Sequence, residues 1–169
     1  MKIFVTPNQD SPYNLMISHP AYSDITRNSG ETDDQVLTRT ISRFREVNKI
    51  GDDVESHIVE DTAIPHDHNC NTSCEFFDAW EWRDSGARVN MAKARVIHMD
   101  NIRVIRNREL AAKDITFMRA VEDGNTDAQA TIKAEKQSLR DIPQTFDITT
   151  GVDTPEKLKA KWPDGLPTE

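Results

Sequence analysis

Apolar side chains recur at helical spacing through the second half of the chain. Beginning after Asn90, a residue typical of a helix N-cap, they follow at intervals of three or four residues as far as Ile105, and the pattern then continues to Val121. The pattern stops at Gly124-Asn125, because glycine favours the left-handed conformation in which many helices end. It predicts one long amphipathic helix with these stripe positions: Met91, Ala94, His98, Ile102, Ile105, Leu110, Phe117, Met118 and Val121.

A second helix is predicted directly after this interruption. Thr126 and Gln129 have the spacing of a capping box, and Ile132 and Leu139 continue the apolar pattern until Pro143, which is expected to end the helix. Two helices joined by a short glycine-containing turn form an antiparallel hairpin.

The hairpin, over residues 90–141, is expected to bury part of its apolar stripe and to turn the rest toward another subunit, since hairpins of this size rarely cover the whole stripe alone. His98 is expected to be a packing residue rather than a ligand. The side chains predicted to be buried are Met91, Ile102, Ile105, Phe117, Met118, Ile132 and Leu139.

The first half has shorter elements. Residues 1–28 predict one short strand, from the apolar start Ile3-Phe4-Val5, followed by loops rich in proline. Thr32 and Gln35 form a capping-box pattern ahead of a helix that should end between Asn48 and Gly51. Residues 56–60 predict a second short strand.

Four aromatic residues lie within seven positions after these elements. Phe77 and Trp80 are expected to be core residues that hold the first half against the helices, so that Trp80→Ala should be strongly destabilising. The full set is Phe76, Phe77, Trp80 and Trp82.

These elements predict an α+β fold in three regions. Residues 1–83 form an acidic region of short strands with one helix, residues 84–142 form the helical hairpin, and residues 143–169 form an extended tail. Thr154-Pro155 places proline at the first helical position, which predicts a short helix over residues 155–161.

Charge is distributed unevenly along the chain. Residues 1–80 carry all of the net charge of −8, whereas residues 81–169 are balanced. An acidic half disfavours nucleic acid and favours a cationic protein partner. Cations of the long helix are expected to pair with acids of the first half or of another subunit, and they are Lys93, Arg95, Arg103, Arg106 and Arg108. Apolar runs are too short for a membrane span or a signal peptide, so no membrane insertion is expected.

One polar segment concentrates metal-ligating side chains. His66, His68, Cys70 and Cys74 supply the four ligands that a closed structural zinc site requires. The alternative is an exposed polar loop without metal. Histidine and cysteine could also be a base and a nucleophile, but no oxyanion-hole motif accompanies them and the loop would not hold them in place.

Enzymatic activity is not expected. Asp114 and Asp141 have no second carboxylate placed beside them, so capping and ion pairing are their predicted roles. The sequence contains no phosphate-binding loop and no dinucleotide-binding glycine pattern.

The order of several short motifs resembles small proteins encoded among bacteriophage tail genes, and the C-terminal part is similar to the phage tail assembly chaperone family. The resemblance covers roughly residues 55–163, and the His- and Cys-bearing segment is an insertion in it. The motifs include Ile64-Pro65, Phe77-Asp78-Ala79-Trp80-Glu81, Met91-Ala92-Lys93-Ala94-Arg95, Phe117-Met118-Arg119-Ala120, Leu139-Arg140-Asp141 and Trp162-Pro163.

The resemblance implies a structural component of the virion tail, such as an adaptor, fibre-associated or baseplate protein. It would be made in the host bacterial cytoplasm and would contact other tail proteins and further copies of itself. One alternative is an assembly chaperone that binds an immature tail protein and then leaves. Another is a zinc-stabilised binding module without a viral role.

Overall fold

The structure is a computed structural model that describes residues 2–7, 15–18, 27–60, 62, 64 and 75–168. The chain has an α+β fold, as the sequence predicts. It divides into two compact units, residues 1–90 and residues 91–169.

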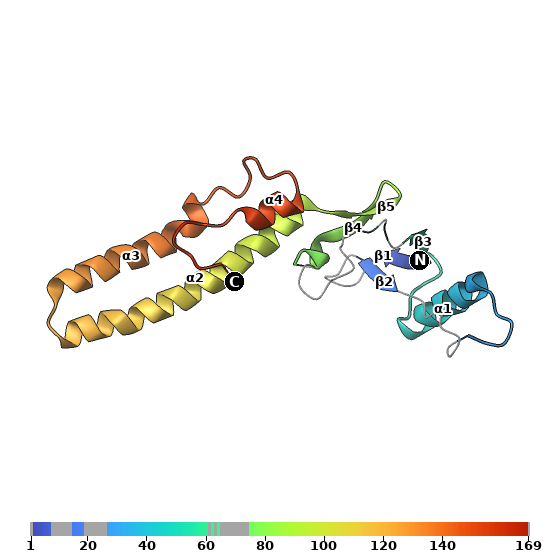
Figure 1. Ribbon diagram of the computed structural model, residues 1–169, viewed down its shortest axis with the longest axis horizontal. Helices are drawn as coiled ribbons and strands as arrows, with labels where there is room; N and C mark the ends of the chain where they lie inside the picture. The colour runs from blue at the N-terminus through green and yellow to red at the C-terminus, as the bar shows by residue number, and fades with distance from the viewer. Residues whose placement is uncertain are drawn as a thin grey trace. The chain divides into compact units, whose positions relative to one another are not determined.

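The N-terminal unit contains a three-stranded antiparallel sheet, in the order β2-β1-β3 (Figure 1). Its strands are β1 (Lys2–Pro7), β2 (Leu15–Ser18) and β3 (His57–Glu60). β1 and β3 were predicted from the sequence. The expectation of a single strand in residues 1–28 is wrong, because β2 pairs with β1 from Pro7 opposite Leu15 to Phe4 opposite Ser18.

β1 is buried on both faces because it is the central strand. Ile3 and Val5 point into an apolar cluster, where the register brings Val59 beside Ile3. Phe4 points to the other face, and its ring meets that of Phe44 edge-on at 5.1 Å. Ile3, Phe4 and Val5 are all fully buried, so both faces of β1 contribute to the core of the unit.

The second face of the sheet is covered by α1 (Asp33–Val47), which contributes Phe44. The predicted capping box is present. The Thr32 hydroxyl accepts from the Gln35 amide, and the Gln35 side chain accepts from the Thr32 amide at 2.8 Å. Both otherwise unpaired amides are thereby satisfied, and the helix ends at the predicted position, with Asn48 as its C-cap.

A two-stranded hairpin completes this unit and was not predicted. A short 3-10 helix, η2 (Phe77–Ala79), leads into β4 (Trp80–Arg83), which pairs with β5 (Gly86–Val89). Asp84 and Ser85 both have positive φ, at 51° and 58°, as a two-residue turn between strands requires. The boundary drawn from the sequence after residue 83 falls in this turn, whereas the two compact units meet at Asn90.

The C-terminal unit is an antiparallel hairpin of α2 (Met91–Glu122) and α3 (Thr126–Thr145), which confirms the prediction (Figure 1). Gly124 has a φ of 65° in the turn. The predicted cap at Thr126 is wrong by one residue, since the Asn125 side chain accepts from the Ala128 amide.

α3 also continues through Pro143, which was expected to end it. Proline lacks the amide proton that would bond one turn back, yet the Phe146 amide donates to the Ile142 carbonyl and closes the last turn. The chain then returns through α4 (Pro155–Ala160), which begins with proline as predicted and ends one residue earlier than expected. Thr154 is its N-cap, and Leu158 is fully buried.

Candidate interaction surface

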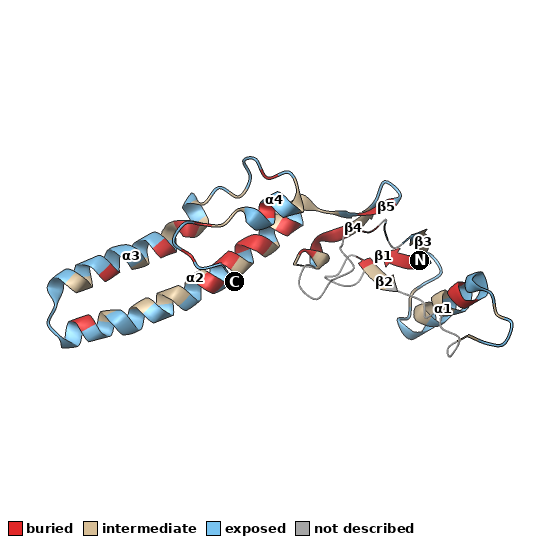
Figure 2. Ribbon diagram, in the orientation of Figure 1, coloured by how far each residue is buried: buried red, intermediate tan, exposed pale blue. Residues whose placement is uncertain are grey.

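One face of α2 packs inside the C-terminal unit. Ile102 and Ile105 are buried against residues of α3 and of the C-terminal segment, including Leu139, Ile142 and Leu166. Figure 2 shows that the buried positions of α2 concentrate at its α4 end and become sparse toward the turn. This face, which we call the inner face, fixes α2 in the hairpin.

His98 belongs to the inner face and ties α2 to the end of the chain. It is 1% exposed, and its Nε2 donates to the Lys161 carbonyl oxygen at 2.9 Å. Its ring also meets that of Trp162 edge-on at 5.5 Å. Nearby, Arg95 Nη2 donates to the Val152 carbonyl oxygen at 2.7 Å. The sequence-based interpretation of His98 as a packing residue is thus consistent with its place.

The residues singled out from the sequence fall into three groups. Phe77, Met91 and Phe117 are half-buried. Met118 is 57% exposed, so its predicted burial is wrong. The buried group comprises Trp80, His98, Ile102, Ile105, Ile132 and Leu139.

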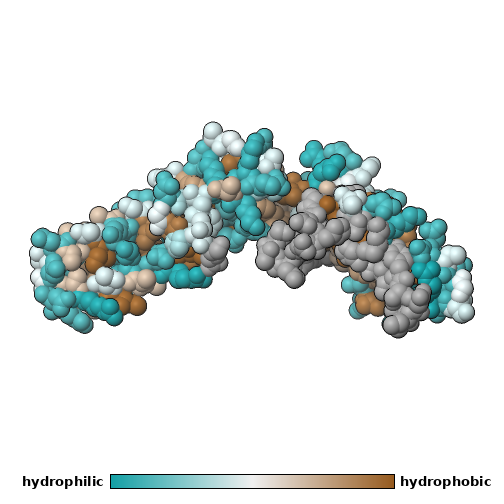
Figure 3. All heavy atoms as spheres, in the orientation of Figure 1, coloured by the Kyte–Doolittle hydropathy of each residue, from teal (hydrophilic) through white to brown (hydrophobic). Residues whose placement is uncertain are grey.

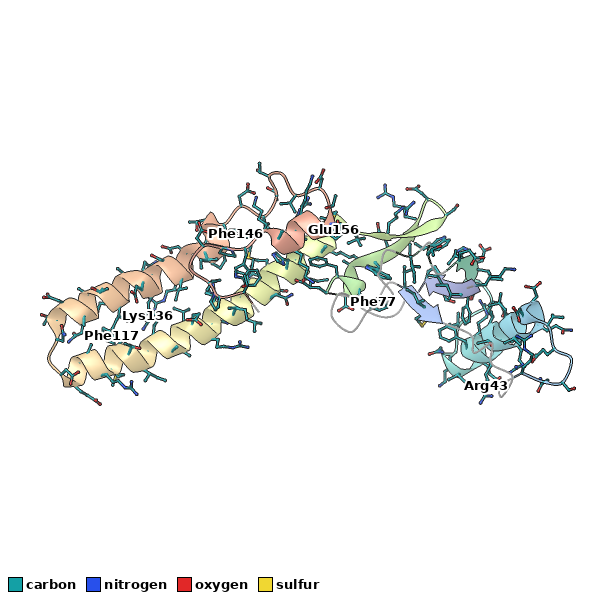
Figure 4. All side chains as sticks on the ribbon, viewed as in Figure 1. Arg43, Phe77, Phe117, Lys136, Phe146 and Glu156 are labelled. Atoms are coloured by element: carbon teal, nitrogen blue, oxygen red, sulfur yellow. The ribbon has the colours of Figure 1, made fainter. Side chains whose placement is uncertain are left out.

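Phe117 and Met118 differ because neighbouring residues of a helix point about 100° apart, and only one of them can face α3. Figure 4 shows Phe117 and Lys136 between the two helices. The Lys133 and Lys136 Nζ atoms lie 5.6 Å and 5.5 Å from the centroid of the Phe117 ring. Met118 is consequently turned to the surface.

Met118 is not alone on that surface. α2 carries five large apolar side chains that are between 44% and 60% exposed, on the side opposite Ile102 and Ile105. Figure 3 shows scattered patches of hydrophobic atoms among hydrophilic ones on the surface of the hairpin. We call this set the outer face, and it consists of Val96, Val104, Ile115, Met118 and Val121.

α2 therefore has two apolar faces. The predicted stripe corresponds to the first of these faces and includes only Met118 and Val121 from the second. A signal for the outer face was present, because Val96, Val104 and Ile115 also lie on one side of a helix. Isolated exposed apolar residues are normal on protein surfaces, whereas several on one side of a helix make that side a candidate contact surface.

The hairpin is braced by ion pairs between its helices. Lys113 Nζ lies 2.7 Å from Glu135 Oε2, and Lys136 binds Asp114, which gives Asp114 its predicted ion-pairing role. Asp141, for which capping or pairing was expected, accepts a hydrogen bond from the Gln137 side chain at 2.8 Å. These contacts occupy the sides of the helices and leave the outer face uncovered within the described unit.

Three of the cations predicted to pair with the acidic first half bond within residues 91–169. Besides Arg95, Arg103 lies 2.6 Å from Asp100, one turn earlier on α2, and Arg106 donates to the Asn107 side chain at 2.9 Å. The charge of Arg103 is therefore paired within its own helix, and the acidic half of the chain is not needed for it.

An open cleft of about 380 Å³ lies between α2, α3 and the C-terminal segment. Glu109, Glu135 and Asp164 line it together with Lys113, and the Lys113–Glu135 ion pair offsets part of its acidic charge. Leu139 and Ile142 contribute an apolar side.

The predicted zinc ligands His66, His68, Cys70 and Cys74 lie outside the described residues. Among the residues that the structure describes, no group of three or more histidine, cysteine or acidic side chains is arranged to hold a metal ion.

Comparison with known proteins adds no relative: no protein-family model, no curated protein and no solved structure matches the chain. Within the described part of the chain, no helix is both long enough and apolar enough to cross a membrane.

Proposed function

We propose that this chain is a structural protein that acts through protein–protein contacts made by the outer face of α2. One observation carries the proposal: five large apolar side chains stand exposed along one side of a helix whose other side is already packed. Exposed apolar side chains are unfavourable in water, and several of them on one side of a helix are typical of a surface that another protein covers.

The hairpin is suited to present such a surface. α2 is 32 residues long, and its inner face, the Lys113–Glu135 pair and the Lys136–Asp114 pair fix it to α3. A partner that binds α2 therefore meets an already ordered helix and does not have to order it on binding, which lowers the entropic cost of association.

The resemblance of the ordered motifs to phage tail proteins supports a place in a bacteriophage tail. We propose a non-enzymatic virion component, such as an adaptor, fibre-associated or baseplate protein, with other tail proteins among its partners. A tail assembly chaperone is the alternative. It would use the same outer face on an immature tail protein and would leave before completion.

Mass spectrometry of purified phage particles separates these roles. A virion component is expected in the particles at a fixed ratio to the other tail proteins. A chaperone is expected in lysates of infected cells and not in particles.

Substitution of the outer face tests whether that face is the binding surface. Ile115→Asp should abolish incorporation into particles, because it places a charge in the middle of the apolar row, while the purified variant keeps its unfolding temperature. Val47→Asp is the matched control, since Val47 is 70% exposed on α1. Normal incorporation of Ile115→Asp would refute the proposed surface.

A further inference from the structure

Four residues of the outer face belong to a line of exposed positions that extends along nearly the whole of α2. Beginning at Lys93, nine residues follow at intervals of three or four, and all nine are exposed. We call them the outer line, and they are Lys93, Val96, Asp100, Val104, Asn107, Ala111, Ile115, Met118 and Glu122.

The positions of the outer line fall into three series in which successive members lie 11 residues apart, although the residue types differ. An 11-residue repeat corresponds to about 3.67 residues per turn, close to the 3.6 of a straight helix, so the line stays on one side of α2. The line is about 44 Å long. The three series are Lys93, Val104 and Ile115, then Val96, Asn107 and Met118, and finally Asp100, Ala111 and Glu122.

The order of charges along the outer line is informative about the partner. A cation, Lys93, begins the line, and an anion, Glu122, ends it. When the outer lines of two copies are placed side by side in antiparallel orientation, Lys93 of each copy lies opposite Glu122 of the other. Asn107 of one copy then lies opposite Asn107 of the other at the centre. Opposite charges therefore meet, and an asparagine pair can hydrogen-bond across the two-fold axis.

The apolar residues match in the same register. Val96 falls opposite Met118, and Val104 falls opposite Ala111, so apolar side chains meet apolar side chains on both sides of the axis. Asp100 falls opposite Ile115, and its charge is offset by Arg103 of its own helix, at 2.6 Å.

A parallel arrangement has the opposite properties. It would place Lys93 against Lys93, Asp100 against Asp100 and Glu122 against Glu122, and each like-charged pair disfavours association. The pattern thus distinguishes between the two orientations.

We propose that the outer line binds the outer line of a second copy of this chain, antiparallel and about a two-fold axis at Asn107. The interface is isologous, since the same surface of each copy contributes to it. This inference rests on the proposed function and names the partner of its binding surface.

The test is the solution mass of the full chain, measured by sedimentation equilibrium over a range of concentrations. The chain is expected to be a dimer. Lys93→Glu or Glu122→Lys alone should raise the dissociation constant about tenfold, because each creates two like-charged pairs. The dissociation constant of the double variant should return to within about threefold of the original value, because both end pairs again join opposite charges, with the signs exchanged. Arg140→Glu, an equal charge change at an exposed position of α3, is the control and should leave the dissociation constant unchanged.

Mixing the two single variants gives a further check. One carries two anions at the ends of its outer line and the other carries two cations, so the mixture should form heterodimers more readily than either variant forms homodimers.

A monomeric chain at all concentrations, or a double variant that stays as weak as the single ones, would overturn the antiparallel dimer. Photo-crosslinking from position 115 in assembled particles then distinguishes the self-association from the proposed function. A crosslink to a different tail protein would leave the proposed function standing without the self-association, and no crosslink to any protein would remove both.

Discussion

Individual residues of the N-terminal unit can be tested for their part in the core. Trp80 is 3% exposed and packs in the cluster around Ile3 and Val5. Trp80→Ala should lower the free energy of unfolding by about 3–5 kcal/mol, because it removes a large buried aromatic side chain and leaves a cavity. Denaturant unfolding measures the change.

The control for Trp80 is Ile58→Ala in β3. Ile58 is 53% exposed, so its loss should change the free energy of unfolding by no more than about 0.5 kcal/mol. If Trp80→Ala were as mild as Ile58→Ala, the aromatic cluster would not be the core of this unit.

The start of α1 depends on a charge pair that responds to pH. Glu31 lies 2.8 Å from Arg39 Nε and accepts from the Asn28 amide, and these bonds lower the pKa of Glu31 from 4.5 to about 2. A carboxyl group whose folded pKa is lowered stabilises the fold above its unfolded pKa, and this contribution is lost as the pH falls through the folded value.

Glu31→Gln should therefore reduce the unfolding temperature at pH 6. The difference from the unmodified chain should shrink as the pH falls from about 4.5 toward 2, where Glu31 becomes protonated in both states. Unfolding followed by circular dichroism at several pH values measures it. A difference that is constant over this range would show that the Glu31–Arg39 pair does not contribute.

At the scale of elements, the cap of α3 can be assigned by a pair of substitutions. Asn125 accepts from the Ala128 amide at 3.0 Å, whereas Thr126 is the first residue of the helix. Asn125→Ala should cost about 1 kcal/mol of unfolding free energy, since an amide at the helix start loses its partner.

Thr126→Ala should be neutral or slightly stabilising, because alanine favours helix interiors more than threonine does. The reverse order of the two effects, measured by thermal unfolding, would restore the cap that the sequence pattern predicted.

Elements with strong local signals could be predicted from the sequence. α1 and α2 combine capping residues with apolar periodicity, and both begin and end within a few residues of their predicted limits. β2 and the β4–β5 hairpin were missed for a physical reason. Strands of four residues acquire their stability from a neighbouring strand, and the pairing of Leu15 with Pro7 joins residues that no local pattern connects.

The binding surface could be predicted only in part. The sequence led us to expect that part of the apolar stripe faces another subunit. This remains a proposal, and the outer face supplies the residues that would make the contact. The sequence pattern of α2 contains two apolar series, and which of them faces α3 depends on tertiary packing. The sequence pattern placed Met118 among the residues that face α3. Phe117, the residue before it, has the position toward α3, and Met118 is exposed.

At the scale of the whole molecule, the chain consists of two compact units with different compositions. Residues 1–80 carry the net charge of −8, and the C-terminal unit carries the exposed apolar row of α2. The central claim is that a second copy of the chain covers this row in antiparallel orientation.

Disulfide trapping tests this claim most directly. Val96→Cys and Met118→Cys are introduced separately into a chain whose own cysteines, Cys70 and Cys74, are replaced by serine. The account predicts that a mixture of the two variants forms covalent dimers, because residue 96 of one copy lies opposite residue 118 of the other. Val96→Cys alone should stay uncrosslinked, since its two copies would lie about 33 Å apart along the helices. Rapid crosslinking of Val96→Cys with itself, or no crosslinking in the mixture, would contradict the account.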